Sequence, residues 1–132
     1  MTSRRMLQLQ AEIDQFVRKE VVTIVFNIRN MLIADPPEGT PIDTGFASNN
    51  WWFNEGGPAN SPSVPTEGGA ARIQSDTVKI QSITLNGQPL HLTNNAQYIG
   101  LLNDGYSDQT PANFVERAIL TEQFASRERV AR

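Results

Sequence analysis

Few residues of this 132-residue chain have the types and spacing that catalysis needs. His91 is the only histidine and there is no cysteine, so the chain lacks the ligands of a common zinc site and has no disulfide. Ser48 and Ser61 have no G-x-S-x-G context, and a catalytic triad would have to recruit His91. We therefore expect a protein that is not an enzyme, with His91 in a structural role. A small hydrolase is one competing hypothesis.

Carboxylates and glycines give no stronger signal. Asp104 and Asp108 flank Gly105, but their spacing matches no calcium loop with alternating oxygen ligands, so we interpret them as turn-capping residues. The pairs Gly56-Gly57 and Gly68-Gly69 are not followed by the Lys and helix start of a phosphate-binding loop. The sequence thus predicts no catalytic, cofactor-binding or metal-binding residue.

The charge pattern argues against sequence-specific binding of nucleic acid. The net charge is −3, whereas attraction to phosphates needs clustered Lys and Arg. Between Pro36 and Thr110 the only Lys or Arg residues are Arg72 and Lys79, so the middle of the chain is acidic and its ends are slightly basic. Either this middle part is ordinary solvated surface, or it faces a channel and keeps DNA from adhering.

A long amphipathic helix is expected over residues 4–33. Its apolar residues recur every three or four positions, as on one face of a helix, and are Met6, Leu9, Ile13, Phe16, Val17, Val21, Ile24, Val25, Ile28, Met31 and Leu32. The helix would be about 45 Å long. It would end at Asp35-Pro36-Pro37, because proline disfavours helical geometry in the residue before it. The polar residues in between predict neither a signal peptide nor a membrane span.

The next segments are expected to be irregular. Asp43-Thr44-Gly45 is typical of a tight turn, in which Asp or Thr caps the backbone and Gly adopts positive φ. Residues 46–53 form a strand or a short helix, because so short a segment has no decisive period. Residues 54–69 are rich in Gly and Pro and predict a flexible loop.

Asn86-Gly87 lies between two apolar-rich segments and predicts an antiparallel hairpin of residues 79–85 with residues 88–94. The expected core residues of its first half are Val78, Ile80, Ile83 and Leu85.

Two helices are expected after this hairpin. Residues 96–102 form a short helix ended by Gly105, and Thr110 and Pro111 suit the N-cap and first position of the last helix. The fold class is therefore α+β. A long N-terminal helix and a C-terminal helix pack on a small antiparallel β-sheet, in one domain of residues 1–132.

The aromatic segment Trp51-Trp52-Phe53 has two interpretations. Neighbouring residues on a strand point to opposite faces, so one Trp could enter the core while the other anchors a subunit interface. Alternatively, both rings belong to the core. Asn and Glu residues surround the segment, which argues against a platform for stacking nucleic acid bases.

Three short segments occur in one order: Pro41-Ile42-Asp43-Thr44-Gly45, Thr93-Asn94-Asn95-Ala96-Gln97-Tyr98 and Thr110-Pro111-Ala112-Asn113-Phe114-Val115. Together they resemble the neck or tail-completion proteins of tailed bacteriophages, also called head–tail connector proteins. The residues that match the motifs of this family are Asp43, Thr44, Gly45, Trp51, Asn94, Asn95, Tyr98, Gly105, Pro111 and Phe114. The chain departs from similar proteins at Asn103, where they often carry Glu, and at Phe46 and Asp108, where they tend to be basic.

The resemblance implies a structural virion protein at the head–tail junction, made in the cytoplasm of a host bacterium. Such a subunit forms or joins a six- or twelve-fold ring on the portal–tail axis, through which DNA passes. Its partners would be copies of itself and other neck or tail proteins, such as a connector or a tail terminator. A monomeric tail-associated adaptor or assembly factor that binds a protein partner is the alternative.

Overall fold

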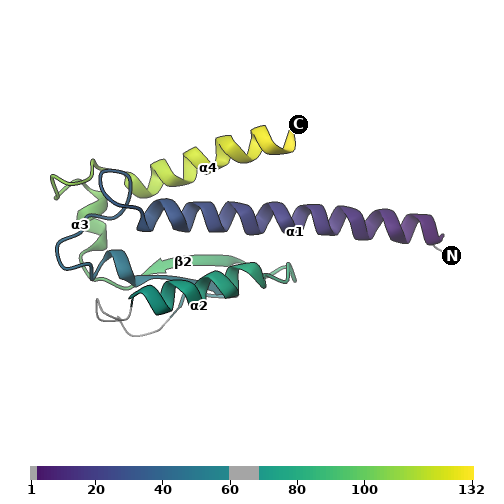
Figure 1. Ribbon diagram of the computed structural model, residues 1–132, viewed down its shortest axis with the longest axis horizontal. Helices are drawn as coiled ribbons and strands as arrows, with labels where there is room; N and C mark the ends of the chain where they lie inside the picture. The colour runs from purple at the N-terminus through teal and green to yellow at the C-terminus, as the bar shows by residue number, and fades with distance from the viewer. Residues whose placement is uncertain (1–2, 60–68) are drawn as a thin grey trace.

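The computed structural model describes residues 3–59 and 69–132 (Figure 1). In chain order the elements are α1 (Arg4–Ile33), the short 3-10 helix η1 (Ser48–Asn50), β1 (Trp51–Glu55), α2 (Gly69–Gln81), β2 (Leu90–Asn94), α3 (Ile99–Asn103) and α4 (Phe114–Val130). α1 lies between α4 on one side and the sheet with α2 on the other (Figure 1). The predicted α+β class, with long N-terminal and C-terminal helices and an antiparallel sheet, is confirmed.

The predicted bounds of the long helix are also confirmed. Ser3 caps the start of α1, because its Oγ accepts a hydrogen bond from the Met6 amide at 3.2 Å. At the other end the Leu32 carbonyl accepts two hydrogen bonds from Thr40, from its amide at 2.9 Å and from its hydroxyl at 2.7 Å. These bonds satisfy a carbonyl in the last turn of the helix and fix the direction in which the chain leaves it.

The predicted hairpin is wrong. β2 pairs with β1 in antiparallel register, from Trp51 opposite Asn94 to Glu55 opposite Leu90, and residues 79–81 belong to α2 instead. The turn at Asn86-Gly87 exists, with Gly87 at φ +86°, but it connects a helix to a strand.

The physical reason lies in the spacing of the buried residues. Asp76, Ile80 and Ile83 are buried at intervals of a helical turn, whereas Val78 is 59% exposed and Leu85 is 40% exposed. A carboxylate at one of the buried positions concealed this helical period in the sequence.

α2 lies along the edge of β1 that does not pair with β2. The buried Asp76 carboxylate accepts a hydrogen bond from the Phe53 amide at 2.8 Å and so satisfies a donor at that edge. Two groups of buried residues form the core beneath α1. One contains Val25, Phe53, Ile80 and Ile83, and the other contains Leu32, Trp51, Phe114 and Ala118.

Two further boundaries differ from the sequence expectations. Within the expected loop 54–69, β1 continues to Glu55 and α2 begins at Gly69, while residues 60–68 lie outside the described residues. The last helix begins at Phe114 rather than at Pro111. Thr110 does not cap it, because the Thr110 hydroxyl is buried and donates to the Gly39 carbonyl at 2.8 Å.

The structure also contains the elements expected before Gly105 and around the aromatic segment. The short helix predicted over residues 96–102 is present as α3 but begins at Ile99, and Gly105 follows it at φ +95°. Residues 46–53 contain both of the alternatives, a 3-10 turn followed by a strand. Among the helices that the structure describes, none combines the length and the apolar character needed to cross a membrane.

Candidate interaction surface

The three motif segments meet at one end of the molecule. The segments 34–47 and 98–112, called the loop end, are joined by a double hydrogen bond in which the side-chain amide of Gln109 accepts from the Ile42 amide at 2.8 Å and donates to the Ile42 carbonyl at 2.7 Å. Asp43, Thr44, Gly45 and Tyr98 line a pocket of about 220 Å³ there. The structure thus brings together residues that are far apart in the sequence.

The turn residues of the motifs hold backbone in place. Gly45 has φ +85°, and the Thr44 hydroxyl accepts a hydrogen bond from the Phe46 amide at 3.3 Å, as expected for a capped turn. Asn94 bonds with both ends of its side chain, donating to the Ala47 carbonyl and accepting from the Ala96 amide, each at 2.8 Å. These contacts tie the end of β2 to the turn that precedes η1.

A second set of contacts fixes the start of α4. Gly105 adopts a left-handed conformation, and a Cβ at that position would lie 3.1 Å from the Ala112 Cβ. Asn103 replaces the missing N-cap side chain, because its Oδ1 accepts from the Val115 amide at 3.0 Å. Phe114 is 1% exposed in the core, while Pro111 lies exposed before the helix. The motif residues of this region therefore have structural roles.

The aromatic segment divides between core and surface. Trp51 is 7% exposed and donates its indole N–H to the Thr40 hydroxyl at 2.8 Å, and Phe53 is also buried. Trp52 points to the opposite face and is half-buried. Of the expected interface anchors Trp51, Trp52 and Phe53, the first and third are core residues, and Trp52 alone keeps an accessible side chain.

Of the candidate catalytic residues, Ser61 lies outside the described residues, and the other two are accounted for by the fold. Ser48 is buried in η1, and His91 is half-buried on β2 opposite Asn54. Within residues 3–59 and 69–132 no group of three or more His, Asp or Glu side chains could hold a metal ion.

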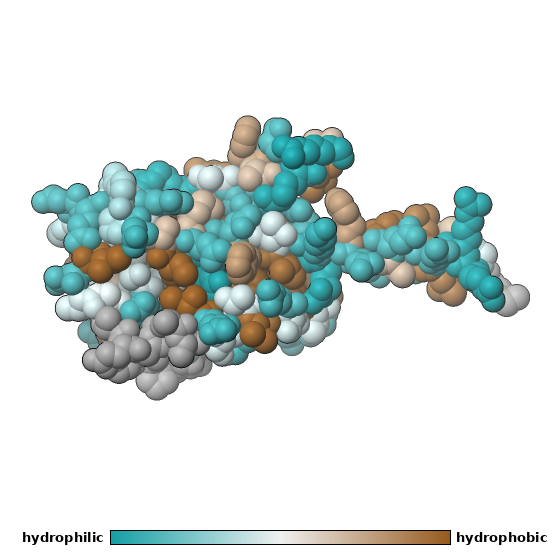
Figure 2. All heavy atoms as spheres, in the orientation of Figure 1, coloured by the Kyte–Doolittle hydropathy of each residue, from teal (hydrophilic) through white to brown (hydrophobic). Residues whose placement is uncertain are grey.

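The most unusual surface is the N-terminal part of α1. Residues 4–19, called the arm, are all exposed, and the N-terminal part of the arm extends beyond every other element (Figure 1). The arm stripe consists of five apolar residues, Met6, Leu9, Ile13, Phe16 and Val17, whose exposed fractions lie between 45% and 58%. Figure 2 shows such hydrophobic residues along the arm beside hydrophilic ones. The sequence predicted this stripe but did not reveal that the rest of the chain leaves it uncovered.

The arm stripe continues a face of α1 that is covered further along the helix. There, α4 packs on α1, and the Asn27 side chain donates to Glu122 at 3.2 Å. Glu20 marks the last turn under α4, where it pairs with Arg129 at 2.8 Å. Arg129 also pairs with the buried Glu122. Beyond Glu20 the same face has no cover within the described residues.

These ion pairs fix the base of the arm on the α4 side. The hydrogen bond from Arg129 lowers the pKa of Glu20 below its ordinary value, and hydrogen bonds to Glu20 and Glu122 raise the pKa of Arg129. On the opposite side Arg18 donates to the carbonyls of Ile83, at 2.8 Å, and Gln81, at 2.6 Å. A cation thus caps the C-terminal end of α2. Neither contact could be predicted from a local pattern, since the partners are far apart in the chain.

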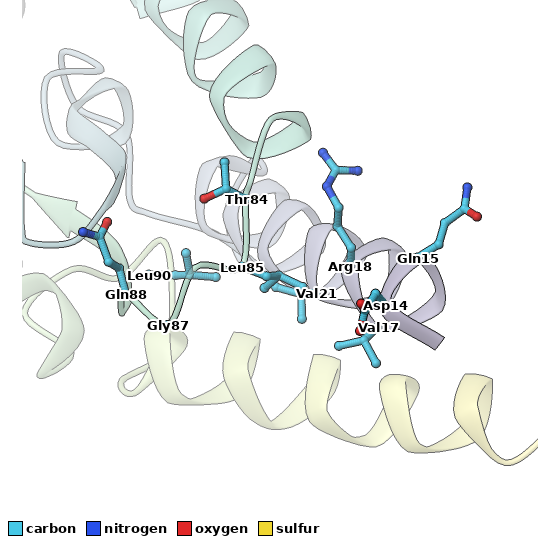
Figure 3. Close-up of a pocket in the computed structure, with 10 residues that line it drawn as sticks. All are labelled: Asp14, Gln15, Val17, Arg18, Val21, Thr84, Leu85, Gly87, Gln88 and Leu90. Atoms are coloured by element: carbon cyan, nitrogen blue, oxygen red, sulfur yellow. The ribbon is translucent and has the colours of Figure 1, made fainter. Parts of the chain in front are cut away.

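A groove adjoins the arm stripe at this base. It has a volume of about 950 Å³ and lies between α1 and the segment that leads into β2 (Figure 3). Its apolar walls are Val17 and Val21 on one side and Leu85 and Leu90 on the other. Because Val17 belongs to both surfaces, stripe and groove form one continuous apolar region suited to contact with another protein.

Comparisons with protein-family models, with curated protein sequences and with solved structures give no match to this chain.

Proposed function

We propose that this chain is a structural subunit of the head–tail junction of a tailed bacteriophage. It acts as a neck or tail-completion protein that forms or joins a ring on the portal–tail axis, where DNA passes. Its partners are copies of itself and other neck or tail proteins, such as a connector or tail terminator. The ordered motif segments at the loop end support this family assignment.

One observation carries the assembly function, namely the exposed arm stripe. Single exposed apolar residues are common on protein surfaces, but a stripe that continues a buried helix face is typical of a protein–protein interface. Most of the stability of a helix in a protein comes from packing of its apolar face, which the arm lacks within the described residues. A partner that covers the stripe would therefore stabilise both the arm and the complex.

The contacts of the motif residues support a structural role over a chemical one. Asn94 and Thr110 bond to backbone groups of neighbouring loops, and Asn103 bonds to the Val115 amide and to the Glu116 carboxylate. Such bonds give the loop end a defined shape, which a subunit needs if it is to be recognised by its neighbours.

The test is quantitative mass spectrometry of tailed particles purified from the source culture. We expect this chain to co-sediment with the particles, at a ratio to the portal subunit of about one half for a six-fold ring or about one for a twelve-fold ring. Absence from particles would overturn the virion assignment. A substoichiometric amount without a fixed ratio would instead favour the adaptor or assembly factor.

A further inference from the structure

The arm and the loop end lie at opposite ends of the molecule and differ in charge (Figure 1). The arm begins with Arg4 and Arg5, both exposed. Neither segment of the loop end contains a Lys, Arg or His residue. Its exposed acidic residues are Asp35, Glu38, Asp43, Asp104 and Asp108. Four acidic residues of the middle of the sequence, together with Asp35, therefore lie at one end of the folded chain, and the two arginines at the start of the sequence lie at the other.

Both ends also expose apolar surface. At the loop end Tyr106 is 76% exposed, Leu101 is 50% exposed and Tyr98 is 40% exposed. Tyr98 and Tyr106 border the pocket of about 220 Å³ beside the Asp43-Thr44-Gly45 turn. Aromatic residues next to a pocket are frequent anchors of protein interfaces. On the arm, Met6 follows the two arginines directly, and Leu9 comes three residues later.

We propose that the arm of one copy docks on the loop end of a second copy. Arg4 and Arg5 lie against the acidic loops, and the first turns of the arm stripe lie against Tyr98 and Tyr106. The inference rests on the proposed function and names the two surfaces that join neighbouring subunits.

The occupant must be another molecule, because α1 is one continuous helix. Its C-terminal end is held in the loop end by the bonds between Leu32 and Thr40, and the arm points away from there. A copy cannot place its own arm on its own loop end. Charge complementarity and shared apolar character favour a second copy, since both halves of the contact are present in one chain.

The contact joins two different surfaces and is therefore heterologous. Each copy has one arm and one loop end, so the contact can repeat from copy to copy, as the subunit contacts of a ring do. Exposed opposite charges supply part of the attraction, and added salt should weaken the assembly.

The experiment uses two full-length variants, each with one defective surface. The arm variant carries Arg4→Gln, Arg5→Gln and Leu9→Ser, and the loop-end variant carries Asp104→Asn, Tyr106→Ser and Asp108→Asn. All six positions are exposed, so both variants should fold, which circular dichroism can verify. Sedimentation velocity at low salt then measures the mass of each variant alone and of their equimolar mixture.

We expect each variant alone to stay at the 14.6 kDa of one chain, while the wild type assembles. The mixture should form a dimer and stop there, because an intact arm and an intact loop end remain for one joint only. As a matched control, Leu120→Ser changes an exposed residue of α4 outside both surfaces and should assemble like the wild type. A wild type that stays monomeric, variants that still assemble, or a mixture that stays monomeric would overturn the inference.

The two proposals fail separately. If the chain is present in particles at a fixed ratio but the mixture stays monomeric, the virion function stands and the subunit contact is a different one. If the mixture dimerises but particles lack the chain, the contact stands and the virion function fails.

Discussion

The two halves of α1 carry the same spacing of apolar residues, yet the rest of the chain covers only one of them. In the C-terminal half Leu32 is 2% exposed and Val25 is 9% exposed. In the arm Leu9, a residue of the arm stripe, is 50% exposed. An apolar stripe on a helix therefore indicates that this face will be buried. It does not specify whether the same chain or another molecule buries it.

The halves also differ in their buried polar groups. Arg29 lies in the covered half, 4% exposed, and donates to the Ile73 carbonyl at 3.1 Å and to the Thr77 hydroxyl at 2.7 Å. Its guanidinium also lies 5.2 Å from the centre of the Phe26 ring. Burial lowers the pKa of Arg29, and the negative charge of Asp76 opposes that shift. The covered half is thus fixed by charge as well as by packing.

The largest effect is expected from Arg29→Ala. The change removes these contacts and leaves the buried Asp76 carboxylate with one cation fewer nearby, so it should cost about 3–5 kcal/mol of the free energy of unfolding. Urea unfolding followed by circular dichroism measures the loss. Arg5→Ala in the arm is the matched control and should cost no more than about 0.5 kcal/mol. Equal losses of unfolding free energy in the two variants would show that the two halves of α1 do not differ in this way.

A pair of leucine variants tests the apolar part of the same contrast. Leu32→Ala should cost about 3 kcal/mol because it creates a cavity beside Trp51 and Phe114. Leu9→Ala should cost no more than about 0.5 kcal/mol in the monomer, since its side chain is 50% exposed. Both variants are compared by urea unfolding at a protein concentration that keeps the chain monomeric. A large loss from Leu9→Ala would mean that the arm folds back onto the body in solution.

Low pH should weaken the ion pair of Glu20 with Arg129, which lies at the boundary between the two halves of α1. The pKa of Glu20 is lowered, so its contribution to stability is fully present above its ordinary value of 4.5 and is lost as the pH falls through the lower folded value. Because Glu20 and Arg129 are partly exposed, we expect the loss to be no more than about 1 kcal/mol. The free energy of unfolding, measured from about pH 6 to about pH 3, should fall less steeply in Glu20→Gln than in the wild type.

The control for this pH dependence is Glu12→Gln, which removes an exposed carboxylate from the arm. It should keep the acid slope of the wild type. If Glu20→Gln also keeps that slope, the ion pair with Arg129 does not hold α4 to α1 in solution.

The parts of this molecule that sequence could predict are those with local causes. The bounds of α1 follow from its stripe and from the prolines after it, and Gly45 and Gly87 mark turns that need positive φ. α2 was missed because the polar Asp76 occupies a core position, where it serves the edge of a strand distant in sequence. The local sequence predicts Thr110 as an N-cap, but its hydroxyl donates to the carbonyl of Gly39, which is distant in the sequence.

The candidate interaction surface likewise has features that the sequence predicts and features that it does not. The arm stripe and the motif residues could be identified in the sequence, because each is a local pattern. That the stripe is uncovered, and that the acidic residues gather at the loop end, depends on where α4 ends and on how the loops fold together. These features depend on contacts between segments that are far apart in the sequence, so no periodic pattern in the sequence indicates them.

The smallest effect is expected from Ala11→Gly, at an exposed position within the arm. Glycine destabilises a helix by about 0.5–1 kcal/mol relative to alanine, and position 11 lies more than one helical turn beyond the contacts of Arg18 with the end of α2. Amide hydrogen exchange should therefore be faster in the arm of this variant, while the amides of residues 21–33 exchange as in the wild type. Faster exchange along the whole of α1 would show that its two halves unfold as one unit. On assembly the arm amides should become protected in both the variant and the wild type. When a second copy covers the arm stripe, that interface must open before the arm helix can unfold.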